Sequence, residues 1–189
     1  IQDRFTYSYS ADFNRDGQNN DLIYVPNGPS EITFASKTIT VNGVAKVFTP
    51  QEQSDALFAY IEQDSYLSKR KGQYAERNGA KMPWLNRVDM NIVQEVFRDV
   101  AGKKNSFQFT ADILNFGNLI NKEWGTLKRI NTSSLLQPAN QNSLVTGGAV
   151  LPTFRLADFN NDLVRSTYSD NQSISSTYYM QFGVRYNFN

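Results

Sequence analysis

The sequence predicts an all-β fold whose long antiparallel strands belong to a transmembrane β-barrel. Three features support this prediction: an alternating apolar stretch at the C-terminal end, two further alternating stretches joined by a short turn, and long connections elsewhere. Outer-membrane barrels combine long extracellular loops with short periplasmic turns, and their strands alternate apolar and polar residues. A soluble sheet that covers a hydrophobic core is the alternative that alternation leaves open.

Residues 178–188 alternate between two kinds of side chain. Tyr178, Met180, Phe182, Val184, Tyr186 and Phe188 fall on one side, opposite Tyr179, Gln181, Gly183, Arg185 and Asn187. Successive side chains of a strand point to opposite faces, so the two faces of this strand suit different solvents. The first face is apolar and unusually aromatic, which favours contact with lipid.

The same stretch resembles the C-terminal targeting strand of outer-membrane β-barrels. The matching residues are Gln181, Gly183, Tyr186 and Phe188, spaced as polar, x, Gly, x, x, aromatic, x, aromatic. Gly183 would let a neighbouring strand approach closely, and the aromatic pair would anchor at the membrane interface. Asn189 departs from the pattern, because such strands usually end on the aromatic residue. The resemblance implies recognition by the barrel-assembly machinery.

Composition excludes several functional classes. The 189 residues include 19 Lys and Arg and 18 Asp and Glu, so the net charge of +1 gives no drive toward nucleic acid. The chain has neither Cys nor His, which excludes thiol and imidazole catalysis. The sequence contains no run of about twenty apolar residues, so no membrane helix is predicted. A hydrolase using Asp158 and Asp162 would need a nucleophile or metal nearby, so we expect no enzyme activity.

The chain begins inside an alternating stretch, without Met or a signal peptide, and we interpret it as a C-terminal fragment. Over residues 2–10 one side is polar, and the other is aromatic from Phe5 to Tyr9. This alternation predicts a barrel strand with its polar residues inside and its aromatic residues outside.

An Asx-rich segment opens the first long connection. Asp12, Asn14 and Asp16 lie at spacing two before Gly17, as in the first half of an EF-hand calcium loop. The second half departs from that motif, because Ile23 stands where a bidentate Glu belongs. Two interpretations stay open, an Asx turn and a structural calcium site. The candidate calcium ligands are Asp12, Asn14, Asp16, Gln18 and Asp21.

The first connection, residues 11–83, also contains signals for a hairpin and a helix. Asn42-Gly43 is the strongest short hairpin signal and predicts paired strands over 39–47. A helix is predicted over 50–63, with Thr49, Pro50 and Glu52 at its start and Leu57, Tyr60 and Ile61 on its apolar side. We therefore expect a small folded cap and not a flexible tether.

Residues 84–116 predict a β-hairpin on a short turn at 101–105, and the terminal strand at 177–188 follows a second long connection, 117–175. The apolar residues of the hairpin are Val88, Met90, Ile92, Val96, Phe107, Phe109, Ala111 and Ile113. The polar residues expected to face the barrel lumen are Arg87, Asp89, Glu95, Asp112 and Arg185.

Five sequence blocks, spread over nearly the whole chain, show a family resemblance: 16–26, 66–69, 72–80, 83–89 and 112–119. They are similar to the C-terminal part of TonB-dependent outer-membrane receptors, in particular the Oar-like group with its carboxypeptidase-regulatory-like domain, which is related to SusC-like receptors. The resemblance implies a barrel of about 22 strands around an N-terminal plug. The plug and the other strands are not in this sequence. An unclosed sheet leaves backbone groups unpaired in lipid, so we expect that this piece cannot insert into a bilayer alone.

The resemblance implies a transporter that imports a ligand across the bacterial outer membrane, with connections 11–83 and 117–175 in the extracellular vestibule. The partners it implies are the remaining barrel and plug, the TonB complex, outer-membrane lipid and lipopolysaccharide, and a surface lipoprotein. Tyr24, Tyr74 and Trp124 would stack on sugars or peptides, or would hold the loops together. The alternative function is an adhesin or an accessory barrel component of a larger surface complex.

Overall fold

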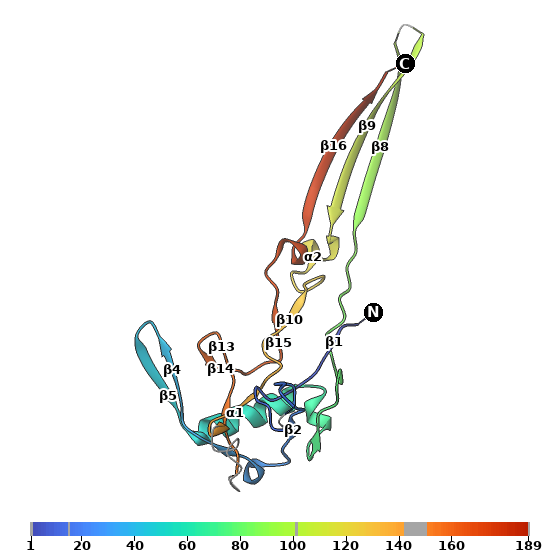
Figure 1. Cartoon of the computed structure of the whole chain (residues 1–189). Helices are drawn as coiled ribbons and strands as arrows, with labels where there is room; N and C mark the ends of the chain where they lie inside the picture. The colour runs from blue at the N-terminus through green and yellow to red at the C-terminus, as the bar shows by residue number, and fades with distance from the viewer. Residues whose placement is uncertain (1, 15, 101, 142–150, 189) are drawn as a thin grey trace. The chain divides into compact units, whose positions relative to one another are not determined.

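The computed structural model describes residues 2–14, 16–100, 102–141 and 151–188. Strands make up 40% of the chain and helices 17%, so the fold is mainly β (Figure 1). None of the described helices is both long enough and apolar enough to cross a membrane. The chain forms two compact units: unit 1 is Ile1–Pro83 with Ile130–Ser169, and unit 2 is Trp84–Arg129 with Asp170–Asn189.

Unit 2 is built on a three-stranded antiparallel sheet with the strand order β16-β9-β8 (Figure 1). Its strands are β8 (Met90–Val100), β9 (Lys103–Leu114) and β16 (Tyr179–Asn187). The hairpin between β8 and β9 is confirmed, but its turn is shorter than the predicted 101–105. Val100 pairs with Lys103, because Gly102 takes a positive φ of 77° that permits a two-residue turn.

The other elements of unit 2 lie next to the ends of the sheet strands. They are α2 (Phe116–Ile120), which follows β9, and a 3₁₀ turn, η3 (Ile174–Ser176), which precedes β16. Asn115 is buried in a left-handed conformation, and its backbone N–H donates to Asp89 Oδ1 at 2.7 Å. Phe116 N donates to Val88 O at 2.7 Å. These bonds hold the segment before β8 outside the ladder, so the strand predicted from Trp84 begins only at Met90.

Unit 1 consists of short strands and one long helix. Its pairs are β1 (Arg4–Phe5) with β7 (Ala80–Lys81), β2 (Tyr24–Val25) with β6 (Gln73–Tyr74), β4 (Lys37–Val41) with β5 (Val44–Phe48), and β13 (Asp158–Phe159) with β14 (Asp162–Leu163). A three-stranded sheet has the order β11 (Leu136–Pro138), β12 (Thr153–Leu156), β3 (Thr33–Phe34). β12 and β3 are parallel and come from the two predicted connections, which therefore fold together. β10 (Lys128–Ile130) and β15 (Tyr168–Asp170) each contain a boundary between the units.

The hairpin and helix predicted in the first connection are confirmed. Asn42 and Gly43 have φ values of 50° and 81°, which fit the two-residue turn that joins β4 to β5. The helix α1 is Pro50–Gln63, and its N-cap Thr49 forms the predicted capping box with Glu52. Two 3₁₀ turns, η1 (Pro29–Glu31) and η2 (Leu67–Lys69), complete the segment. The apolar side of α1 is buried in the core through Leu57, Tyr60 and Ile61.

The capping box predicts a pH dependence of helix content. Thr49 N donates to the Glu52 carboxylate at 2.7 Å, and this bond lowers the pKa of Glu52. Because the pKa is lower in the folded state, the stabilisation is present above the unfolded value of about 4.3 and is lost as pH falls through the folded value. Glu52→Gln can form the same box without a charge. We expect circular dichroism to show a weaker loss of helix in acid for Glu52→Gln, and an identical loss would contradict this role.

The aromatic residues of 2–10 lie in the core of unit 1, so the prediction of a lipid-facing strand there is wrong. Only Arg4–Phe5 forms a strand, and Tyr7 is 0% exposed. The Tyr7 ring stacks on Tyr66 at 6.4 Å and meets the edge of Phe5 at 5.0 Å. The aromatic residues find these partners inside unit 1, because its segments fold back over the first ten residues.

A buried polar network joins three segments of unit 1 around Asp64. Its carboxylate accepts hydrogen bonds from Tyr7 Oη at 2.7 Å and from Thr167 Oγ1 at 2.6 Å. Tyr7 Oη also lies 3.1 Å from Tyr60 Oη. Burial, with Tyr60 and Asp64 nearby, raises the pKa of Tyr7, so its hydroxyl stays protonated. The network ties the N-terminal segment and the 130–169 segment to the C-terminal end of α1.

Candidate functional site

The strand register of unit 2 places its apolar residues on one face of the sheet. Met90, Ile113 and Met180 share one row, and Val96, Phe107 and Tyr186 share another. Directly opposed residues lie on the same face of a sheet. We call this surface the apolar face; it consists of Met90, Ile92, Gln94, Val96, Phe107, Phe109, Ala111, Ile113, Met180, Phe182, Val184 and Tyr186. Gln94 is its one polar residue, and none of these described positions is charged.

The apolar face is exposed and long. Phe182 is 74% exposed and Val184 is 70% exposed, so the protein does not bury this face itself. Soluble monomers rarely expose a continuous apolar patch of this kind. The strands have 11, 12 and 9 residues, whereas strands of globular proteins usually have about five or six and membrane-spanning strands about 9–11. Both its exposure and its length therefore suit contact with lipid.

The opposite face of the sheet carries polar residues. It holds three of the predicted lumen residues, Glu95, Asp112 and Arg185. Gln108 lies directly between Glu95 and Arg185 in the register. The other two, Arg87 and Asp89, precede β8 and form an ion pair of 3.2 Å. This face is less polar than predicted, because it also holds the exposed apolar residues Val93 and Phe97.

Two residues of the targeting-strand pattern, Gly183 and Tyr186, contact residues of β9. A Cβ added to Gly183 would lie 2.5 Å from Thr110 Oγ1, so glycine leaves room for the side chain of the opposing residue in β9. The Tyr186 ring lies 4.6 Å from Phe107, and its hydroxyl donates to Asn105 Oδ1 at 2.8 Å. The glycine role predicted from the sequence is consistent with this geometry, and recognition by an assembly machinery stays a prediction.

Gly183 and Thr110 give a testable pair. We expect Gly183→Ala to destabilise unit 2 by about 1–3 kcal/mol, because the added methyl group overpacks the contact with β9. Thr110→Ala removes the opposing hydroxyl, so the double variant should recover most of that loss. Denaturant titration followed by Trp fluorescence measures unit 2, since Trp84 and Trp124 both belong to it. Additive effects of the two substitutions would contradict the contact.

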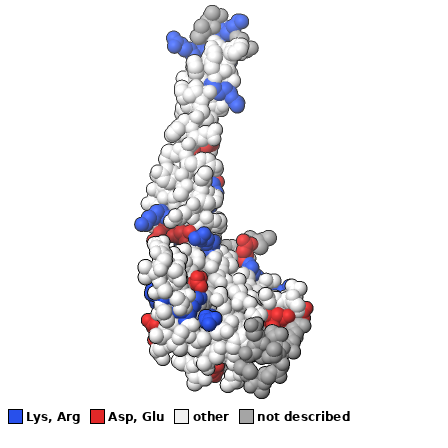
Figure 2. All heavy atoms as spheres, turned by 60° about the vertical axis from the view of Figure 1, so that its left-hand side comes forward, with Lys and Arg blue, Asp and Glu red and all other residues white. Residues whose placement is uncertain are grey.

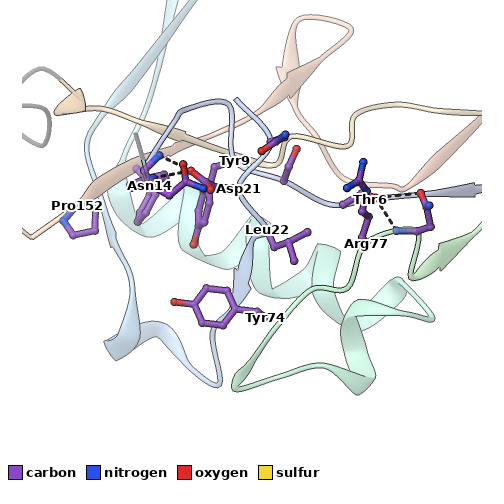
Figure 3. Close-up of a pocket in the computed structure, with 13 residues that line it drawn as sticks. Thr6, Tyr9, Asn14, Asp21, Leu22, Tyr74, Arg77 and Pro152 are labelled. Carbon is purple, nitrogen blue, oxygen red and sulfur yellow. Dashed lines mark hydrogen bonds between the residues drawn. The ribbon is translucent and has the colours of Figure 1, made fainter. Parts of the chain in front are cut away.

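A pocket of about 890 Å³ opens in unit 1, and aromatic rings form much of its wall (Figure 3). Tyr9 stacks on Phe154 at 5.6 Å with an angle of 18° between the rings. The Phe13 ring meets Tyr9 edge-on at 4.7 Å. Tyr74, which is largely exposed, adds a further ring. Exposed ring surfaces in a concave site suit the apolar faces of a small ligand.

Polar groups complete the pocket wall. Asp21 Oδ2 accepts hydrogen bonds from the backbone N–H groups of Phe13 and Asn14, which fixes the carboxylate at the wall. Arg77 and Asn20 also line the pocket, and neither side chain is paired within the described residues. Figure 3 shows Asn14, Asp21 and Tyr9 together, with Arg77 beside Thr6 farther along the pocket. The pocket thus offers both hydrogen-bond donors and acceptors beside its rings.

Sequence reasoning anticipated this pocket only in part. Of the three aromatic residues proposed to stack on a ligand, Tyr74 lines it. Tyr24 meets Tyr74 edge-on at 5.4 Å but donates its hydroxyl to Glu31, and Trp124 belongs to unit 2. Arg77 and the stacked pair of Tyr9 and Phe154 were missed. Tyr9 shortly before the Asx-rich segment and Phe13 within it were the available signal, whereas nothing local predicts the contact with Phe154.

The predicted calcium loop forms a set of turns closed by its own side chains. Asp12 Oδ2 accepts from Gly17 N at 2.8 Å, Asn14 Oδ1 from Asp16 N at 2.9 Å, and Asp16 Oδ1 from Gln18 N at 2.8 Å. The bonds of Asn14 and Asp16 each span two residues, as the Asx-turn interpretation expects, whereas the bond of Asp12 spans five. Among the described residues, no three acidic side chains converge as metal ligands. Calcium binding by Asp12, Asn14, Asp16, Gln18 and Asp21 stays a prediction.

The two carboxylates considered for hydrolytic chemistry each pair with a cation. Lys37 is 6% exposed, and its Nζ donates to Asp158 Oδ1 at 2.6 Å and to Leu156 O at 2.5 Å. Lys46 Nζ donates to Asp162 Oδ1 at 3.2 Å. These ion pairs hold β4 and β5 against the segment that contains β12 to β14.

Comparison of the chain with protein-family models, with curated proteins and with solved structures found no match in any of the three. The resemblance to TonB-dependent receptors therefore stays a prediction.

Proposed function

We propose that this chain forms C-terminal barrel strands of an outer-membrane transporter of the TonB-dependent receptor type, and that unit 1 contributes to its extracellular ligand vestibule. The observation that carries this proposal is the exposed, uncharged apolar face over three long strands. Lipid-facing surfaces of barrels have this character, with polar residues on the opposite side of each strand.

The free edges of the sheet support a larger barrel. Within the described residues, β8 and β16 each pair on one side only. Unpaired backbone groups in lipid cost several kcal/mol each, so both edges need neighbouring strands. In this proposal further strands of the same protein supply them, and the face with Glu95 and Arg185 lines the interior.

The connections indicate which side of the membrane each part would occupy. The β8–β9 turn has two residues and would be periplasmic, since periplasmic turns of barrels are short. Unit 1 joins the opposite ends of the strands and would be extracellular. Its pocket would then receive the ligand before transport, with Tyr9 and Tyr74 against apolar surfaces and Arg77 and Asp21 against polar groups.

Fractionation of cell envelopes with an antiserum against unit 1 tests the location. We expect the chain in the outer-membrane fraction, resistant to extraction with alkali, and we expect the antiserum to label intact cells. Recovery in the soluble fraction would contradict the proposal. Loss of surface attachment with unchanged ligand uptake in a deletion strain would favour the alternative, an adhesin or an accessory barrel component.

Pocket variants test the vestibule role. Tyr74→Ala and Arg77→Gln remove exposed side chains, so we expect the fold and membrane level to stay unchanged. Both variants should lose binding to compounds that the wild-type chain retains from a mixed library of oligosaccharides and short peptides. Glu62→Gln on the exposed part of α1 is the control. Equal retention by all three variants would exclude the pocket as the binding site.

A further inference from the structure

The apolar face ends in positive charge at the hairpin end of the sheet. Arg98 pairs with Asn105 in the row that follows Val96 and Phe107, and Lys103 lies one row farther on the same face. Both are exposed, and no ion pair found among the described residues involves either head group. The side of unit 2 visible in Figure 2 is mostly uncharged along the strands, with Lys and Arg near the turn.

The position of Arg98 matches the headgroup layer of a bilayer, and the long Lys103 side chain can reach back toward that layer from the next row. Two residues of a strand rise about 7 Å, so Arg98 lies about that far beyond the last apolar row. The headgroup layer adds roughly 5–8 Å to each side of the hydrocarbon core. An aromatic group precedes the cations: the Tyr186 ring lies 4.6 Å from Phe107 and 6.1 Å from Phe188. Aromatic residues favour this boundary between hydrocarbon and headgroups.

At its other end the alternation of the apolar face continues with uncharged residues. Val88 and Tyr178, the next residues of the same alternation at the other end, are uncharged. The hairpin end of this face therefore carries two cations, Arg98 and Lys103, in successive rows.

We propose that Arg98 and Lys103 bind the phosphate groups of anionic phospholipids, of which phosphatidylglycerol is the test lipid. The inference rests on the proposed function, which places the two-residue turn on the periplasmic side, where the leaflet consists of phospholipid. Arg98 offers several N–H donors in a plane that matches phosphate oxygens, and Lys103 adds a point charge. Each cation near an anionic surface strengthens binding roughly fivefold, and two do so roughly 25-fold.

Vesicle flotation with the whole chain tests the proposal. The apolar face should adsorb to phosphatidylcholine vesicles, and vesicles that also contain phosphatidylglycerol should bind roughly 25-fold more tightly at low salt. The double variant Arg98→Gln/Lys103→Gln should lose this preference and keep its binding to phosphatidylcholine. The control, Lys69→Gln/Lys81→Gln, removes two exposed charges from unit 1 and should keep the preference.

The outcomes separate this inference from the function on which it rests. Absence of binding to phosphatidylcholine vesicles would count against a lipid-facing sheet and so against the proposed function. Binding to phosphatidylcholine without a preference for phosphatidylglycerol, or a preference that survives in Arg98→Gln/Lys103→Gln, would overturn the headgroup site alone. Vesicles that contain lipid A provide a further outcome. If the chain prefers them to phosphatidylglycerol vesicles and Arg98→Gln/Lys103→Gln abolishes that preference, the hairpin end lies at the outer leaflet and the assignment to phospholipid is overturned.

Discussion

Replacing Val184 with arginine is expected to weaken association of the chain with phosphatidylcholine vesicles by about thirtyfold or more. Val184 lies within the apolar face and is 70% exposed, so its replacement disturbs no internal packing. The substitution removes the apolar contact of the valine with lipid, worth roughly 2 kcal/mol, and adds the cost of an arginine against lipid, roughly 0–1 kcal/mol near the interface and 2–4 kcal/mol at the midplane. Because 1.4 kcal/mol is about tenfold in affinity, even the lower total gives a large effect. Flotation of vesicles with each chain measures it.

The control for this prediction is Gln108→Arg, which adds the same charge to the other face of the sheet. Gln108 is the neighbour of Phe109 along β9 and lies between Glu95 and Arg185. We expect this variant to bind vesicles as the wild type does. If both substitutions weaken binding equally, the two faces do not differ in their contact with lipid.

Replacing Asp64 with alanine is expected to destabilise unit 1 by about 3 kcal/mol or more. The residue is 4% exposed, and its carboxylate accepts hydrogen bonds from Tyr7, Thr167 and the backbone N–H groups of Tyr66 and Leu67. The substitution leaves these buried donors unpaired, at roughly 1–3 kcal/mol each. Urea denaturation followed by far-ultraviolet circular dichroism measures the loss, since α1 supplies most of the helix signal.

Asp55→Ala is the matched control in the same helix. Asp55 is exposed and accepts a hydrogen bond from Gln51. Exposed substitutions of this kind usually change stability by about 0.5 kcal/mol or less. A similar small effect for Asp64→Ala would mean that the network does not hold the three segments together.

The elements that the sequence predicted correctly are those whose signals are local. Asn42-Gly43 specifies a turn within two residues, and Thr49 with Glu52 specifies a helix start within four. The apolar alternation of β8, β9 and β16 also predicted their common face, because each strand carries its own pattern. Such patterns specify local structure without depending on contacts with distant parts of the chain.

The features that the sequence could not predict depend on distant partners. The aromatic residues of 2–10 alternate as a lipid-facing strand would, yet Tyr7 is buried against Tyr60 and Tyr66. The pocket forms where Tyr9 meets Phe154, and no local signal specifies that contact. Periodicity shows that one side of a segment avoids water, but it does not show whether lipid or protein covers that side.

The contact of β16 with lipid is the central claim, and spin labelling tests it most directly. The chain contains no Cys, so a single Cys carrying a nitroxide can be placed at each position from 180 to 187. In membrane-bound protein we predict that labels at 180, 182, 184 and 186 are accessible to oxygen, whereas those at 181, 183, 185 and 187 are accessible to a water-soluble nickel complex. Equal accessibility of both sets to the nickel complex would contradict a lipid-facing strand.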